Sequence, residues 1–204
     1  MTKRRRRINW FWVTVLVGMI FGMSYFGRYV APEIQNPFVD TPTPTRAPES
    51  FVVEAEKLFE EGKLLQAISA YEDAIRSNPS DPSSYIAMAR VQVFIGYYED
   101  AQESAEKALL LNPNNSMAHA VRGWALDFTQ DYLPAEAAVK RALELDPNNA
   151  LAHAYYAELL ADSYAAGVGP LDSIELAAEE SRVALSLAPD LMESHRARAY
   201  VLEI

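Results

Sequence analysis

The sequence predicts an all-α protein, a solenoid of stacked helix-turn-helix units preceded by a single transmembrane helix. Two observations lead to this prediction. The segment "ALLLNPNNSMAHA", residues 108–120, returns 34 residues later as "ALELDPNNALAHA", residues 142–154. Residues 8–27 contain no charged side chain. A repeat of this period is typical of arrays of one supersecondary unit, and an uncharged run of this length matches a membrane-spanning helix.

Composition and charge exclude several classes of function. Half of the 204 residues are hydrophobic and none is cysteine, so disulfides, thiolate metal sites and cysteine nucleophiles are excluded. From Phe51 onward 11 basic residues stand against 25 acidic ones, a net charge of −14. An acidic body repels phosphates, so we expect no nucleic-acid partner.

The N-terminal segment predicts a basic cytoplasmic tail at residues 1–7 and a transmembrane signal anchor at 8–30. A 20-residue helix rises about 30 Å, the thickness of a hydrocarbon core. A cleaved signal peptide is the alternative, but Ala31 is followed by proline and makes a poor cleavage site. Because the basic residues precede the helix, we expect a single-pass protein of a bacterial cytoplasmic membrane, with its N-terminus in the cytoplasm and its body outside.

Small residues recur at every fourth position of this helix, at Thr14, Gly18 and Gly22. Such spacing lets two membrane helices approach closely, which predicts a helix–helix contact, although glycine is also common in membrane helices. Residues 31–50 follow with five prolines, and proline disfavours helix, so we expect an extended linker.

Residues 51–204 carry the repeats. Pro79, Pro113 and Pro147 are 34 residues apart, and Pro189 follows after 42. Alanine stands five and twelve residues before each of these prolines, and alanine or glycine stands ten residues after it. Apolar residues between the prolines recur at three and four positions, which is helical periodicity. Each unit is therefore expected to be a helical pair whose small residues mark where the helices cross.

This register resembles the tetratricopeptide repeat. The resemblance implies a right-handed solenoid with units near 48–81, 82–115, 116–149 and 150–191, and a partial unit at 192–204. The fourth unit is eight residues too long around residues 163–173, which reads as a surface insertion or, alternatively, a contact loop. The fifth has one helix only, so either the chain is a fragment or another molecule covers its end.

The resemblance also implies that partners bind the concave face, at set positions of the first helix of each unit. Carried onto this sequence, the partner-binding residues are Glu56, Phe59, Arg90, Phe94, Trp124, Asp127, Phe128 and Glu158. Tetratricopeptide domains that hold acidic chaperone tails use lysine, asparagine and arginine at inner positions. Here those positions hold Val52, Glu56, Ala87, Met117 and Val121, so a chaperone co-factor of that type is disfavoured.

No catalytic motif is present, and we expect neither enzyme activity nor a cofactor. His119, His153 and His195 all stand six residues after a unit's proline. Equivalent positions of stacked helices lie about 10 Å apart, too far to share a metal ion. We therefore expect no metal site and assign the three rings to packing.

The sequence thus predicts a non-catalytic, membrane-tethered scaffold that binds a protein or peptide on the extracytoplasmic side. Two alternatives stay open. The protein could self-assemble by stacking through its uncapped last helix, which would make it a homo-oligomer. It could instead be the targeting or regulatory part of a longer enzyme.

Overall fold

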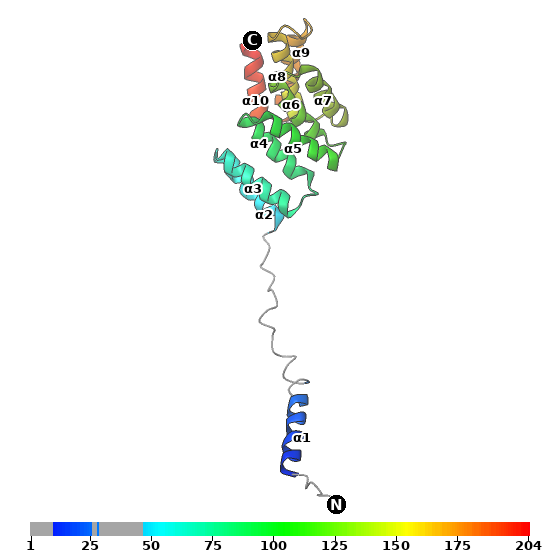
Figure 1. The fold of residues 1–204 in the computed structure, drawn as a ribbon. Helices are drawn as coiled ribbons and strands as arrows, with labels where there is room; N and C mark the ends of the chain where they lie inside the picture. The colour runs from blue at the N-terminus through cyan, green and yellow to red at the C-terminus, as the bar shows by residue number, and fades with distance from the viewer. Residues whose placement is uncertain (1–9, 26–27, 29–46) are drawn as a thin grey trace, which may run out of the picture. The chain divides into compact units, whose positions relative to one another are not determined.

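The computed structural model describes residues 10–25, 28 and 47–204, and the chain divides into two compact units, residues 1–45 and 46–204 (Figure 1). The predicted basic tail at 1–7 and most of the proline-rich linker, residues 31–46, lie outside the described residues.

The first unit contains α1, Trp10–Tyr25, an apolar helix of 16 residues. Such a helix rises about 24 Å, short of the roughly 30 Å of a hydrocarbon core. Within the described part of the chain, no helix has both the length and the apolar character needed to cross a membrane. This finding corrects our prediction of a transmembrane helix at 8–30, and with it the single-pass location in the cytoplasmic membrane and the extracytoplasmic body.

The predicted contact between two membrane helices presupposed that span. Thr14 donates its hydroxyl to the carbonyl oxygen of Phe11 in its own helix, at 2.8 Å. A methyl group added at Gly18 or Gly22 would meet no described atom within 4 Å. Within the described part of this unit, neither glycine is in close packing with another side chain.

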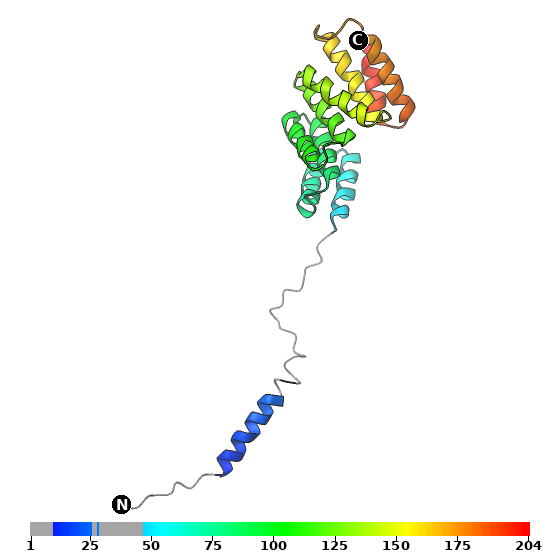
Figure 2. The ribbon, with the colours of Figure 1, turned by 90° about the vertical axis from the view of Figure 1, so that its right-hand side faces the viewer.

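The second unit is a stack of helical pairs, and residues 47–204 contain helices and turns but no strand. Its helices are α2 (Pro48–Glu60), α3 (Leu64–Ser77), α4 (Pro82–Phe94), α5 (Tyr98–Leu111), α6 (Ser116–Phe128), α7 (Tyr132–Leu145), α8 (Ala150–Ala165), α9 (Ser173–Leu187) and α10 (Met192–Glu203). Each packs on its neighbour in the chain (Figures 1 and 2). The predicted all-α repeat solenoid is confirmed.

The turns between units end one helix and cap the next. Asn115 accepts a hydrogen bond from the Ala118 amide at 3.0 Å, and Asn149 accepts one from Ala152 at 3.1 Å. Asp81 does the same at the start of α4. These side chains satisfy amides that the first helical turn leaves unpaired. The asparagine or aspartate two residues after Pro79, Pro113 and Pro147 is therefore a capping signal.

The small residues lie where paired helices cross. The alanines five and twelve residues before each unit's proline are all fully or almost fully buried. At Gly123 an added methyl group would come within 2.4 Å of a Val139 side-chain carbon. Ala199, the equivalent residue of α10, is exposed because no described helix packs on that side.

The helices form an inner and an outer row. The inner helices α4, α6, α8 and α10 each contact the next in that series, and the outer helices α3, α5, α7 and α9 pack on the inner ones. An array whose first helices touch one another while its second helices spread apart curves toward the first. The first helix of each unit therefore lines the concave side, which we call the inner face.

Candidate functional site

The last helix closes part of the inner face. Glu193, at the start of α10, forms an ion pair with Arg90 of α4, 103 residues earlier in the chain. The Glu193 side chain is almost fully buried. The curvature of the array thus brings the fifth unit back against the second. Part of the surface expected to receive a partner is occupied by the chain itself.

A second ion pair lies beside the first. The Arg196 guanidinium donates two hydrogen bonds to the Glu158 carboxylate, both at 2.8 Å. The Trp124 indole N–H donates to the same carboxylate at 3.2 Å. The Arg196 guanidinium also lies over the Trp124 ring, 4.6 Å from its centroid. Burial nevertheless leaves the pKa of Glu158 raised, because desolvation outweighs the attraction of Arg196 and the indole hydrogen bond.

Aromatic rings connect the inner helices. Trp124 stacks on Tyr155 with centroids 4.4 Å apart and meets the Phe94 ring edge-on at 5.2 Å. Phe94 in turn contacts Phe59 of α2. Phe128 stacks on Tyr98 at 4.7 Å but remains 44% exposed. Phe128 is thus the ring of this set that offers most of its area to a partner.

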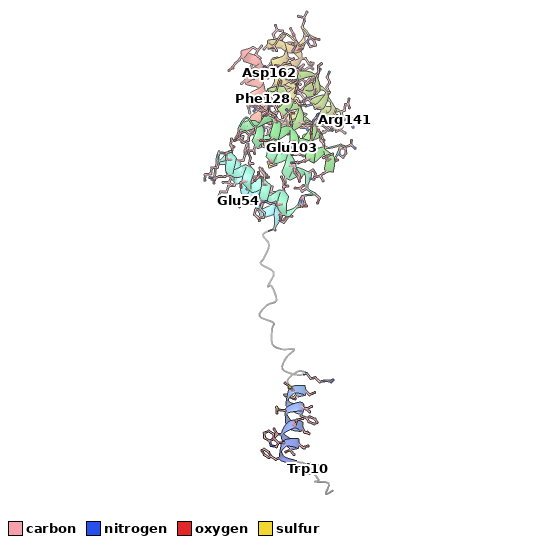
Figure 3. All side chains as sticks on the ribbon, in the orientation of Figure 1. Trp10, Glu54, Glu103, Phe128, Arg141 and Asp162 are labelled. Atoms are coloured by element: carbon pink, nitrogen blue, oxygen red, sulfur yellow. The ribbon has the colours of Figure 1, made fainter. Side chains whose placement is uncertain are left out.

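An open pocket lies next to these rings, between α6, α8 and α10. It has a volume of about 380 Å³. Its lining residues are Asp127, Phe128, Gln130, Tyr132, Glu158, Asp162, Arg196 and Tyr200. We call it the inner pocket. Figure 3 shows two of its residues, Phe128 and Asp162, on the same side of the body.

Acidic groups crowd the inner pocket. The Asp127 carboxyl is 4% exposed, and its Oδ1 atom has no hydrogen-bond partner. Burial, the nearby Asp162 carboxylate, a side-chain hydrogen bond to Asp162 and the Glu158 carboxylate together raise the pKa of Asp127 to about 9. Tyr200 donates its hydroxyl to Asp162. Asp127 therefore carries a proton at neutral pH, since nothing described in the structure supplies it with a counter-ion.

The predicted partner-binding residues fall into three groups. Glu56 is exposed on α2, and Phe59 is half-buried. Trp124 and Glu158 are 1% and 6% exposed. Both of them, like Arg90 and Phe94, form ion pairs or ring contacts with other residues of this chain. Asp127 and Phe128 line the inner pocket. The structure thus brings six of the eight residues together around α4, α6 and α8, and three of them, Asp127, Phe128 and Glu158, line the inner pocket.

Three residues of this region were missed in the sequence. Glu193, Arg196 and Tyr200 hold the second, fifth and ninth positions of the fifth unit, which are inner positions in the repeat register. Applying the register of the first four units to the last one would have identified all three.

The histidines are structural. His119 and His153 each place Nε2 about 3 Å from the carbonyl oxygen of their unit's proline, Pro113 and Pro147. His195 makes the same contact to Pro189. These rings tie the start of each inner helix to the preceding turn. In the part of the chain that the structure describes, no cluster of potential ligands is arranged to hold a metal ion.

The insertion in the fourth unit borders a second pocket. It has a volume of about 560 Å³ and lies between the α6–α7 turn and residues 168–170. Gln130 and Tyr132 line both pockets, so the two adjoin. Leu133, Val168 and Leu171 leave apolar area exposed around this insertion.

Comparison with known proteins agrees with the repeat architecture. Two family models described as tetratricopeptide repeat match residues 58–125 and 118–149. A search of curated proteins gave no match. The chain therefore contains tetratricopeptide repeats, as its register predicted.

Solved structures show the same fold. The first tetratricopeptide domain of Spaghetti (RPAP3), bound to the HSP90 peptide SRMEEVD, has 27% sequence identity and a TM-score of 0.53, and the match covers 59% of this chain and 93% of that one. The tetratricopeptide domain of Arabidopsis OM64 has 25% sequence identity and a TM-score of 0.53, and the match covers 55% of this chain and 93% of that one. MamA from Desulfovibrio magneticus has 21% sequence identity and a TM-score of 0.53, and the match covers 76% of this chain and 82% of that one. This likeness shows the fold alone.

Proposed function

We propose that this repeat array is a non-catalytic scaffold that holds an extended segment of another protein against the inner face. The observation that carries the proposal is the inner pocket, an open space lined by Phe128 and by polar side chains from three inner helices. Exposed aromatic rings in a concave site are favoured anchors for peptides. The match to a tetratricopeptide domain bound to a peptide supports the same class of partner.

The binding region is expected to be the half of the inner face around α6, α8 and α10. Near α4 the inner face is already filled by Glu193 and by the stacked rings of Trp124 and Tyr155. A partner cannot displace these groups without exposing a buried charge, which is strongly unfavourable. Phe128 and the groups around Asp162 remain available, which supports a contact at this end.

Selection of peptides from a random display library tests the proposal. We expect the full chain to enrich a set of related peptides. Phe128→Ala should weaken their binding at least tenfold, measured by isothermal titration calorimetry. Leu110→Ala is the matched control, because Leu110 is 84% exposed on the outer helix α5 and its truncation should leave affinity unchanged. Failure to enrich any peptide, or equal losses in both variants, would refute binding at the inner face.

Self-association is a second candidate. Leu202 is 68% exposed on α10, beside the exposed Ala199. An uncovered apolar helix face in a repeat array favours stacking of another helix. Light scattering over a concentration range tests this: the mass should rise with concentration in the wild type and not in Leu202→Glu. A mass that stays that of a monomer would refute it.

A further inference from the structure

The charges of the inner pocket do not balance. Three carboxyl groups, those of Asp127, Glu158 and Asp162, line it together with a single cation, Arg196. The two N–H groups through which that guanidinium donates hydrogen bonds, Nε and Nη2, both bind the Glu158 carboxylate. No described lysine or arginine forms an ion pair with Asp127 or Asp162. The pocket therefore holds two carboxyl groups that the described chain leaves without a counter-ion.

Asp127 is the group that marks this space as a binding site. It is 4% exposed, it lines the pocket, and its Oδ1 atom has no partner among the described residues. A buried acceptor left unpaired destabilises a fold, because it has lost its hydrogen bonds to water. A cation entering the pocket would satisfy this atom.

The walls of the pocket suit an organic cation. Phe128, Tyr132 and Tyr200 present aromatic rings, and ring faces attract ammonium and guanidinium groups. The carboxyl groups are not arranged to share one metal ion, since no described cluster of acidic or histidine ligands converges. The volume of about 380 Å³ leaves room for a long side chain with its methylene groups against the rings.

We propose that the inner pocket binds the positively charged end of a lysine or arginine side chain on a basic segment of the partner protein. The inference rests on the proposed function and specifies its partner. It also gives this groove the opposite preference from one that holds an acidic peptide. The net charge of −14 after residue 50 attracts such a segment before contact is made.

Binding of a cation should depend on pH through Asp127. The groups facing this carboxyl are Glu158 and Asp162 from α8, Arg196 and Tyr200 from α10, and Tyr132 from α7. With its pKa raised to about 9, Asp127 is protonated at neutral pH and must release that proton to pair with a cation. Affinity should therefore rise as pH increases from 6 toward 9, by at most about tenfold per unit, while lysine stays charged.

The test measures peptide binding to the full chain by two-dimensional NMR. The probes are three blocked heptapeptides that differ only at two positions, which hold lysine, glutamine or glutamate. The Trp124 indole signal is the reporter, because its N–H donates to Glu158 at the edge of the pocket. We expect the lysine peptide to shift this signal in a saturable manner, and the glutamine and glutamate peptides to leave it unchanged.

Variants separate the pocket from general attraction to an acidic protein. Asp127→Asn and Asp162→Asn should each weaken lysine-peptide binding at least tenfold, and Asp127→Asn should also abolish the rise of affinity with pH. Asp100→Asn makes the same change of charge at an exposed position of α5 and should alter affinity less than twofold. Circular dichroism and thermal melting confirm that each variant is folded.

Several outcomes would overturn the inference. Equal binding of the lysine peptide to all three variants would show attraction to the surface only. Saturable binding of calcium chloride at the same signal would assign the site to a metal ion. Binding of glutamate or glutamine peptides instead of the lysine peptide would overturn the inference and leave the proposed function standing. Absence of binding by these probes and by any library peptide would overturn both.

Discussion

The two ends of the inner face are built from the same repeated positions but are very different surfaces. The ninth residue of the first unit, Glu56, is exposed to solvent. The ninth residues of the third and fourth units, Trp124 and Glu158, are buried and contact each other. One end of the face is an ordinary polar helix surface, and the other is an interior with charged groups in it.

The difference comes from curvature. α10 approaches α4, so that Glu193 pairs with Arg90, and Arg196 pairs with Glu158 inside the curve. α2 has no such helix facing it among the described elements. The repeat register therefore decides which residues point inward. The curvature of the superhelix decides whether those side chains contact solvent or other parts of the protein.

Removing the guanidinium of Arg196 should have the largest effect. Arg196→Ala leaves the Glu158 carboxylate buried without a cation, which should reduce the free energy of unfolding by about 3–5 kcal/mol. Urea unfolding followed by circular dichroism measures this. Lys57→Ala at the first unit, where Lys57 and Glu61 pair at the surface, is the control and should cost less than about 0.5 kcal/mol.

The combined variant Glu158→Leu/Arg196→Leu sharpens this comparison. It removes both charges together, so it should recover most of the lost stability. If Arg196→Ala costs no more than Lys57→Ala, the C-terminal end of the inner face behaves as a surface and the contrast between the ends disappears.

The stability of the C-terminal end should also fall as pH rises. Asp127 holds a proton in the folded chain up to about pH 9, whereas it loses that proton near 3.8 when unfolded. The folded state therefore binds more protons between these values, and this group lowers stability by at most about 1.4 kcal/mol per pH unit. Asp127→Asn should be the more stable protein at pH 8 and should lose this slope, as measured by urea unfolding from pH 5 to 8.

A second group titrates in the same range and provides a check. Burial disfavours a charge on His153, but Glu180 and the Pro147 carbonyl outweigh it and raise its pKa. The contribution of His153 to the free energy of unfolding is full below the unfolded pKa of 6.5, and it is lost as pH rises through the raised pKa of the folded state. The loss of stability due to His153 should persist in Asp127→Asn. If that variant shows the same overall dependence of stability on pH as the wild type, Asp127 is already ionised in the folded protein.

A smaller effect is expected at the helix crossing of the third unit. In Gly123→Ala the new methyl group meets Val139 and the Ala135 carbonyl oxygen, so overpacking should exceed the gain in helix propensity. We expect a net loss of about 1–2 kcal/mol in thermal unfolding. Ala137→Gly on the exposed side of α7 is the control for the propensity difference alone. A gain in stability would show that α6 and α7 separate freely.

The apolar N-terminal segment shows where reading the sequence failed. An uncharged run over residues 8–27 predicted a membrane span, but the helix found there is Trp10–Tyr25. Hydropathy reports how apolar a segment is, whereas a span also requires a sufficiently long helix, and no helix among the described residues combines that length with apolar character. The caps of α4, α6 and α8 are local features, because a capping side chain and the amides that it accepts from are neighbours in sequence.

The inner pocket was only half readable. Asp127 and Phe128 could be assigned to the inner face from the register, since that requires only helical periodicity. The sequence did not predict that Arg196 would form its ion pair with Glu158, or that Asp127 would be left without a counter-ion. The residues concerned come from three different units.

The helices, the turns between them and the register of the inner positions follow from local sequence. These depend on spacings of a few residues and on local hydrogen bonds, which any stretch of chain carries with it. Only the tertiary structure decided that α10 meets α4 and that one end of the inner face is closed and charged. That outcome is the sum of small rotations between successive units, and each rotation is set by side-chain packing across the unit boundary.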